Sequence, residues 1–289
     1  MRRRTFVQTF GALAGLSLVR SSPADAMPAW FRANNRHAKL ARIGLELYSV
    51  RKAMKADPER TLAAVRAAGY DDVELLWSFK NFDRTTAQVK ASLANEGLKA
   101  PSAHIDPEIL IYDWETSVGI AKQLGQQYLI VPSLPSEARK SLDVWRIWAD
   151  RMNRAGETAR SAGIWLAFHN EPDHMKKLEG KIPYDTFVEQ LDPKYVRLQL
   201  DVGNMTMGGG DPMSYLTRYR DRYWSFHLKD VVADRSTDTE LGNGDVKLAQ
   251  LLASIPDLAK KPCYVEQEGP ADELESARRN ATYLKTLTF

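Results

Sequence analysis

Residues 60–77 read RTLAAVRAAGYDDVELLW, and this stretch contains the unit that the rest of the chain repeats. Leu62, Val65 and Ala68 recur at helical spacing, which predicts an amphipathic helix. Gly69 follows directly, and glycine is the residue type that most often ends a helix at its carboxyl cap. The apolar run after it predicts a short buried strand. The stretch therefore encodes a helix, its stop and the next strand.

The same order recurs along the chain, with Gly97, Gly125 and Gly163 each standing just before another apolar run. The predicted strands are Ile43–Ser49, Asp72–Trp77, Lys99–Ile105, Tyr128–Pro132, Trp165–Asn170, Val196–Val202, Trp224–Lys229 and Cys263–Gln267. Eight strands at intervals of roughly 30 residues match a (β/α)8 TIM barrel. We predict an α/β protein with one TIM-barrel domain over 43–289, after an irregular lead-in over 27–42. A doubly wound open sheet is the alternative, because periodicity does not show whether the first and last strands pair.

The first 26 residues have the layout of an export signal. Residues 2–4 are arginines, residues 10–19 are uncharged and mostly apolar, and residues 24–26 are Ala-Asp-Ala, which suits signal-peptidase cleavage. We predict a twin-arginine-type signal peptide over 1–26, passage through the twin-arginine export machinery, and a periplasmic or otherwise exported mature protein. No later segment is long and apolar enough to span a bilayer, so we expect no membrane anchor after cleavage.

Composition limits the choice of partners. The chain of 289 residues is 44% hydrophobic and 27% charged, as in ordinary globular proteins. Loss of residues 1–26 would remove four arginines and one aspartate, which brings the formal charge from +3 to 0. A near-neutral surface has no electrostatic footprint for nucleic acid or anionic lipid. Cys263 is the only cysteine, so no internal disulfide can form, and we expect a buried, inert thiol.

Four of the later predicted strands end in polar or charged residues. These ends are Phe168-His169-Asn170-Glu171, Leu200-Asp201-Val202-Gly203-Asn204, Phe226-His227-Leu228-Lys229-Asp230 and Val265-Glu266-Gln267-Glu268. Active sites of TIM barrels lie at the carboxyl ends of the strands. Several carboxylates that converge there need a cation or a shared proton to compensate their charge. One such residue alone more often caps a helix or forms a salt bridge, but four at corresponding positions predict a metal site.

These fragments also carry a resemblance to a known family. The most specific pieces are Leu45-Glu46-Leu47-Tyr48-Ser49-Val50-Arg51, Val73-Glu74, His169-Asn170, Leu200-Asp201-Val202-Gly203, His227-Leu228-Lys229-Asp230, Leu241-Gly242-Asn243-Gly244-Asp245 and Val265-Glu266-Gln267. In this order and spacing the chain resembles the xylose isomerase-like TIM-barrel family, also called sugar phosphate isomerases/epimerases. The resemblance implies one divalent metal ion, Mn²⁺, Mg²⁺ or Zn²⁺, held by Asp201, His227 and Glu266.

A fourth ligand is expected from the fifth strand. His169 and Glu171 lie two positions apart and would face the same side of a continuous strand. Many relatives resemble His-Asn-His here, whereas this chain has Glu171 in the third place. A carboxylate suits each of the candidate cations. We predict that Glu171 binds the metal and that His169 lies next to it as a substrate contact.

The resemblance also implies a chemistry. In the epimerase branch, two glutamates on opposite sides of a substrate carbon exchange protons, which makes Glu171 and Glu266 the candidate acid and base. Lys229 is the expected electrostatic partner, and His104 and Glu46 are expected to contact the substrate. Glu46, like Glu74, reaches the mouth only if the predicted strand registers hold.

We therefore predict a metal-dependent isomerase or epimerase that acts on an unphosphorylated sugar or cyclitol by removing a proton next to a carbonyl. A 3-keto-glycoside lyase or hydratase is one alternative, and a non-catalytic periplasmic sugar-binding barrel is another. An apurinic endonuclease shares the barrel but needs more histidines than the five in this chain. The sequence specifies neither the sugar, the metal nor the oligomeric state.

Overall fold

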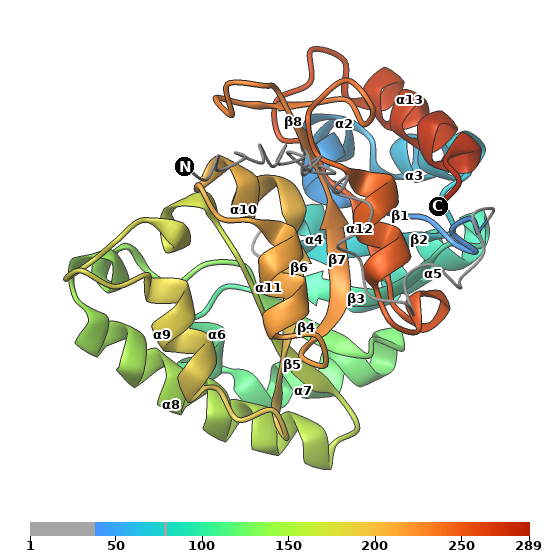
Figure 1. The fold of residues 1–289 in the computed structure, drawn as a ribbon. Helices are drawn as coiled ribbons and strands as arrows, with labels where there is room; N and C mark the ends of the chain where they lie inside the picture. Colours follow the sequence, from blue (N-terminus) through green and yellow to red (C-terminus); the bar gives the residue numbers. More distant parts are fainter. Residues whose placement is uncertain (1–37, 78–79) are drawn as a thin grey trace, which may run out of the picture. The chain divides into compact units, whose positions relative to one another are not determined.

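Eight parallel strands close into a barrel in the computed structural model, which describes residues 38–77 and 80–289 (Figure 1). The strands are β1 (Gly44–Glu46), β2 (Asp72–Leu76), β3 (Lys99–His104), β4 (Tyr128–Val131), β5 (Trp165–His169), β6 (Val196–Asp201), β7 (Tyr223–Leu228) and β10 (Cys263–Val265). Their order around the barrel is β1-β10-β7-β6-β5-β4-β3-β2, and β1 pairs with both β2 and β10. This closure confirms the predicted TIM barrel and excludes the open sheet.

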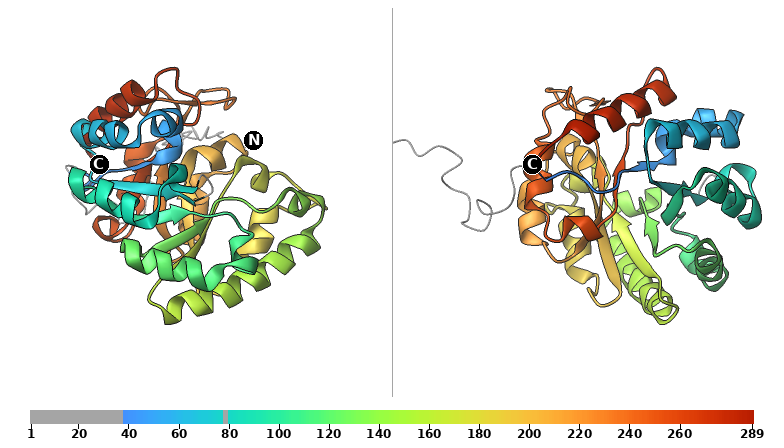
Figure 2. Two further views of the ribbon diagram at one scale, coloured as in Figure 1. Left: turned by 180° about the vertical axis from the view of Figure 1, so that it is seen from behind. Right: turned by 90° about the vertical axis from the view of Figure 1, so that its right-hand side faces the viewer.

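Helices surround the strands (Figure 2). They are α2 (Arg51–Ala56), α3 (Pro58–Ala68), α4 (Lys80–Asp83), α5 (Thr86–Glu96), α6 (Ile109–Tyr112), α7 (Trp114–Leu124), α8 (Leu142–Ser161), α9 (Pro183–Gln190), α10 (Val202–Met207), α11 (Pro212–Arg218), α12 (Leu248–Ser254) and α13 (Glu273–Thr286). Two short strands, β8 (Asp230–Val231) and β9 (Asp238–Thr239), form a separate antiparallel hairpin after β7. As predicted, α3 stops at Gly69, whose φ of 101° is a left-handed conformation that glycine adopts without strain.

The first and last barrel strands are shorter than predicted. The first was expected to continue to Ser49, but β1 ends at Glu46 and a 3-10 turn follows over Leu47–Val50. Leu47 and Val50 are buried in this turn, so apolar spacing alone made it look like a strand. The last was expected to reach Gln267, but β10 ends at Val265. The pairing of β1 with β2 ends at Glu46, and the pairing of β10 with β1 and β7 ends at Val265.

The predicted signal peptide and most of the predicted lead-in lie outside the described residues, so the export signal and the exported location stay predictions. Within the described part of the chain, no helix combines the length and the apolar character that crossing a bilayer requires. The single thiol, Cys263, is buried, and burial raises its pKa to about 12, as expected for an unreactive cysteine.

The inside of the barrel is filled in three levels, and β6 contributes to each. Its sequence VRLQLD alternates apolar and polar residues, so Arg197, Gln199 and Asp201 point inward at successive levels. At the amino end, the Arg197 guanidinium lies 3.5 Å from the ring centroids of both Trp165 and Trp224. This stack fills the amino end of the barrel. Gln199 lies in the middle of the barrel and Asp201 at its carboxyl end.

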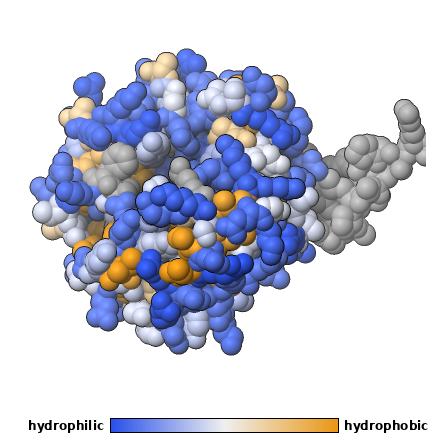
Figure 3. Space-filling model, turned by 90° about the vertical axis from the view of Figure 1, so that its left-hand side faces the viewer, coloured by the Kyte–Doolittle hydropathy of each residue, from blue (hydrophilic) through white to orange (hydrophobic). Residues whose placement is uncertain are grey.

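The main hydrophobic core lies between the strands and the helices. Helix α8 shows why these segments form helices: Ser141 caps its amino end by accepting from the Asp143 amide, and one face buries Trp145, Trp148 and Met152. One side of the surface is mostly hydrophilic, with hydrophobic residues only in scattered groups (Figure 3). Among the described residues, the large hydrophobic side chains that are exposed are Ile111, Tyr112 and Ile147.

A pair of helical glycines tests this packing. A Cβ at Gly156 in α8 would lie 2.8 Å from the Tyr195 carbonyl oxygen, whereas a Cβ at Gly119 in α7 would meet nothing within 4 Å. We expect Gly156→Ala to lower the free energy of unfolding by about 1–3 kcal/mol, because the backbone of Tyr195 cannot move away easily. Gly119→Ala should raise it by about 0.5–1 kcal/mol through helix propensity. Urea unfolding of both variants measures the difference, and equal effects would contradict the predicted close contact.

Candidate metal centre

Four strands bring metal-ligand atoms together at the carboxyl end of the barrel. His169 ends β5, Asp201 ends β6, His227 lies near the end of β7, and Glu266 follows β10. One nitrogen or oxygen from each of these side chains lies within 4.8 Å of the others. Asp201 Oδ2 is 3.6 Å from His169 Nε2 and 4.0 Å from His227 Nδ1. All four residues are buried.

Two of these atoms have no hydrogen-bond partner. His169 Nε2 and Asp201 Oδ2 are both buried without a hydrogen bond, although Asp201 Oδ2 lies 3.1 Å from the Lys229 ammonium. Such atoms are costly in a protein interior unless an ion or water satisfies them. Burial also lowers the pKa of His169, which favours the neutral imidazole that binds metals. The residues present therefore fit a divalent cation.

Asp201 has two separate tasks. Its Oδ1 accepts a hydrogen bond of 2.7 Å from the Asn204 amide and caps α10, while its Oδ2 faces the other candidate ligands. The side chain of Asn170 fixes the same strand end, because it accepts from the Asp201 amide at 3.0 Å and donates to the Asp201 carbonyl at 2.9 Å. Asp201 can therefore cap α10 with one oxygen and bind a metal with the other.

His227 lies between two carboxylates. Its Nδ1 is 2.7 Å from Glu266 Oε2 and its Nε2 is 2.6 Å from Glu74 Oε1. Burial alone would lower the pKa of His227, but the charge of Glu74 and the hydrogen bonds to both carboxylates hold it well above its usual value. A carboxylate behind a metal-binding histidine fixes the ring and its tautomer. Glu74 is therefore placed to orient Nδ1 toward the metal group.

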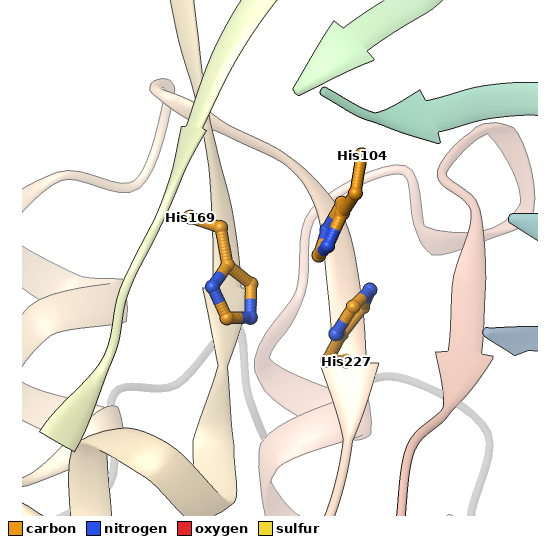
Figure 4. A group of neighbouring side chains, drawn as sticks. All are labelled: His104, His169 and His227. Atoms are coloured by element: carbon orange, nitrogen blue, oxygen red, sulfur yellow. The ribbon is translucent and has the colours of Figure 1, made fainter. Parts of the chain in front are cut away.

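A second polar layer lies beneath the metal group. His104 Nδ1 is 3.1 Å from Glu46 Oε1, and His104 Nε2 is 2.8 Å from Gln199 Oε1. Gln199 also donates to both oxygens of Glu74, at 3.0 and 3.1 Å. Figure 4 shows the rings of His104, His169 and His227 turned toward one another from β3, β5 and β7. The three imidazoles form a further group with ligand atoms within 4.8 Å of one another.

Glu46 and His104 are strongly shifted in this layer. Burial, reinforced by the charge of Glu266, raises the pKa of Glu46 to about 7. Burial acts to lower the pKa of His104, but the charges of Glu74 and Glu46 outweigh it and raise that pKa to about 9. Both nitrogens of His104 face protein groups, while Glu46 Oε2 is buried without a hydrogen-bond partner. Of these two predicted substrate contacts, only Glu46 thus has an oxygen that no protein donor occupies.

Glu171 lies beside the metal group but does not belong to it. Strand β5 ends at His169, and Glu171 precedes a 3-10 turn over Pro172–Met175. The strand ends before Glu171, so the two-residue alternation that would place His169 and Glu171 on one strand face does not extend to Glu171. The Glu171 carboxyl is 28% exposed, accepts from Asn204 Nδ2 at 3.2 Å and lies 3.9 Å from His169 Nδ1. Geometry favours His169 as the fifth-strand ligand, with Glu171 at the mouth.

Lys229 is the cation that lies against the candidate ligands. Its Nζ is 3.1 Å from both Asp201 Oδ2 and Glu266 Oε1, and its side chain is fully buried. Burial alone would lower the pKa of Lys229, but the charges of Asp201, Glu266 and Glu268 raise it well above its usual value. The neighbouring chain makes room for it, because a Cβ at Gly203 would lie 2.5 Å from Lys229 Cγ. The predicted electrostatic partner therefore lies where it can compensate two buried carboxylates.

Glu74 is the residue whose role sequence reasoning missed. It was expected to reach the mouth only if the predicted registers held, with a salt-bridged position in the barrel as the alternative. It lies one level deeper, behind His227, and pairs with His227 and His104, as in that alternative. Burial acts to raise its pKa, yet the charges of His104 and His227 outweigh this and lower it to about 2. A usable signal was present in the strand DVELL, since a lone carboxylate on the inward face of a buried strand needs a nearby donor.

A TIM barrel with two imidazoles and two carboxylates gathered at the carboxyl ends of its strands defines a candidate metal-dependent enzyme of this fold class. The chain belongs to the xylose isomerase-like TIM barrel family, whose family model matches residues 62–287.

Individual relatives cover less of the sequence. The inosose dehydratase of Salmonella typhimurium is 34% identical over 88 residues, which is 30% of this chain and 28% of that protein. The chain thus matches less than a third of the length of this curated relative. A solved sugar phosphate isomerase/epimerase from Parabacteroides distasonis has a TM-score of 0.74 at 23% identity, over 85% of this chain and 98% of that one. The solved IOLI protein, which has a bound zinc atom, has a TM-score of 0.64 at 14% identity, over 84% and 96%.

The position of Glu74 gives a first test of the metal centre. We expect Glu74→Gln to weaken Mn²⁺ or Zn²⁺ binding by about 10–100-fold, because His227 loses the carboxylate that orients its ring. Calorimetric titration of metal-free protein measures the affinity. Ser225→Ala is the matched control, because it removes a hydrogen bond to Gln199 in the same layer without touching His227. Unchanged affinity in Glu74→Gln would contradict the orienting role.

A second pair of variants decides between the two fifth-strand candidates. We expect His169→Ala to lose the metal, because its Nε2 belongs to the four-residue group. Glu171→Ala should keep the metal and lose turnover instead. Elemental analysis after purification without chelators reports the bound metal for each variant. If Glu171→Ala loses the metal and His169→Ala keeps it, Glu171 and not His169 is the fifth-strand ligand.

Proposed function

We propose that the protein is a divalent-metal-dependent enzyme that removes a proton from the carbon next to a carbonyl group of an unphosphorylated sugar or cyclitol. The observation that carries this proposal is the buried group of His169, Asp201, His227 and Glu266, in which two ligand atoms have no hydrogen-bond partner. Two nitrogen and two oxygen donors suit Zn²⁺ or Mn²⁺ better than Mg²⁺. A bound divalent ion would polarise the carbonyl and so acidify the adjacent C–H.

The protein's own residues divide the remaining work. Both oxygens of Glu266 are engaged, one by His227 and one by Lys229. Glu171 is partly exposed, holds one hydrogen bond from Asn204 and lies next to the metal group. Glu171 is therefore better placed than Glu266 to exchange a proton with a substrate carbon or hydroxyl. Lys229 compensates the charge of Asp201 and Glu266, which keeps their carboxylates in place.

Isomerisation or epimerisation is the proposed outcome of this proton transfer, and elimination is the second candidate. The comparison with solved isomerases/epimerases establishes the fold, while the inosose dehydratase relatives favour loss of water after the same first step. The two outcomes share the removal of a proton next to a carbonyl and differ in where a proton is returned. In isomerisation or epimerisation a proton returns to carbon, whereas in elimination it goes to the departing oxygen.

An exchange experiment tests the shared step and separates the outcomes. Protein loaded with Mn²⁺ or Zn²⁺ is incubated in D₂O with a panel of ketoses, inososes and 3-keto-glycosides and followed by NMR. We expect deuterium at the carbon next to the carbonyl, and Glu171→Gln should slow this exchange by about 100-fold or more. New epimers or ketose isomers support the isomerase, whereas released water or aglycone together with an unsaturated ketone supports the lyase. Tight sugar binding without exchange would favour the non-catalytic binder and end the proposal.

A further inference from the structure

The ammonium group of Lys229 has more oxygen neighbours than it has protons. Besides Asp201 and Glu266 at 3.1 Å, its Nζ contacts Asn204 Oδ1 at 2.8 Å and Glu268 Oε1 at 2.6 Å. Three N–H bonds cannot satisfy four acceptors fully. The shortest of the four contacts is the one to Glu268, a residue outside the metal group.

Glu268 is the outermost member of this cluster. Lys229 and Asp201 have no exposed surface and the Glu266 side chain is 7% exposed, whereas the Glu268 side chain is 44% exposed. The order from the barrel interior to the solvent is thus metal-group carboxylates, ammonium, then the Glu268 carboxylate. The hairpin after β7 fixes this residue, because Asp238 Oδ2 accepts a hydrogen bond of 2.6 Å from the Glu268 amide.

The solvent side of Lys229 therefore presents the negative charge of Glu268, which is partly exposed and holds Lys229 in an ion pair behind it. Glu171 is the other partly exposed carboxyl, but burial and the neighbouring carboxylates raise its pKa well above its usual value and so favour its neutral form. Arg51, one turn beyond β1, is engaged by the Tyr48 carbonyl at 2.8 Å and lies over the Tyr48 ring. A phosphate or carboxylate that approaches Lys229 meets the carboxylate of Glu268 first, whereas a neutral hydroxyl can donate to it.

We propose that Glu268 is a specificity-determining residue: it covers Lys229 and excludes phosphorylated and carboxylated sugars, so that the site accepts uncharged keto-sugars and cyclitols. The inference rests on the proposed function, because it takes the ligand to be a sugar. Like charges a few ångströms apart at a partly solvated site repel strongly enough to change affinity by about tenfold or more. Removal of the Glu268 charge should therefore favour an anionic sugar over its neutral counterpart.

Two sugars that differ only in a phosphate test this, D-fructose and D-fructose 6-phosphate, titrated calorimetrically into metal-loaded protein. We expect Glu268→Gln to bind the phosphate ester about tenfold more tightly than the native protein, with fructose affinity changed by less than about twofold. Glu268→Asp keeps the charge and should keep the exclusion. Glu189→Gln removes an equivalent charge from α9, where Glu189 pairs with Arg218, and should change neither affinity.

Several results would overturn the proposal. They are no gain for the phosphate ester in Glu268→Gln, an equal gain for both sugars, or the same gain in Glu189→Gln. Thermal melts of each variant establish that the fold is intact, and Glu268→Asp gives an independent comparison if Glu268→Gln is destabilised. Failure of the proposed function is recognised separately, by the absence of deuterium exchange in the native protein, because the binding comparison needs no turnover.

Discussion

The position of His227 between Glu74 and Glu266 is the constraint on which the rest of the site depends. The two contacts, 2.6 and 2.7 Å, tie together β2, β7 and the end of β10, three strands that are far apart in sequence. An imidazole held at both nitrogens cannot rotate without breaking a buried, charge-assisted hydrogen bond. The orientation of Nδ1 toward Asp201 and Glu266 is therefore set by the barrel itself.

Charge balance explains how so many acidic groups can be buried together. Glu46, Glu74, Asp201 and Glu266 are all buried at the carboxyl half of the barrel. His104, His227 and Lys229 are each in contact with at least one of them. A buried carboxylate is costly alone but tolerable when paired and hydrogen-bonded. In this network His169 Nε2 makes no hydrogen bond and Asp201 Oδ2 lies 3.1 Å from the Lys229 ammonium, and the two atoms are 3.6 Å apart. The hydrophobic core is displaced to the layer between strands and helices, which leaves the barrel interior available for polar chemistry.

The family and the fold say less about the reaction than the residues of the site do. TIM barrels support many reactions, and the relatives of this chain carry both isomerase/epimerase and dehydratase names. The residues around the metal group therefore matter most. Glu171 stands after β5, outside the metal group, and Glu268 closes the solvent side of Lys229. These two glutamates give the mouth an acidic character that bears on both proton transfer and substrate charge.

The sequence alone determined the barrel and most of the residues at its mouth, because both follow from local patterns. Helix spacing before Gly69, the alternation in VRLQLD and the polar strand ends at Asp201, His227 and Glu266 are all readable within a few neighbouring residues. Only the tertiary structure decided where β1 stops, that His169 rather than Glu171 faces Asp201, and that Glu74 supports His227. Strand ends are set by partners distant in sequence. A side chain beyond the last ladder pair follows its turn, not the strand's period of two, so its direction depends on contacts that no local pattern contains.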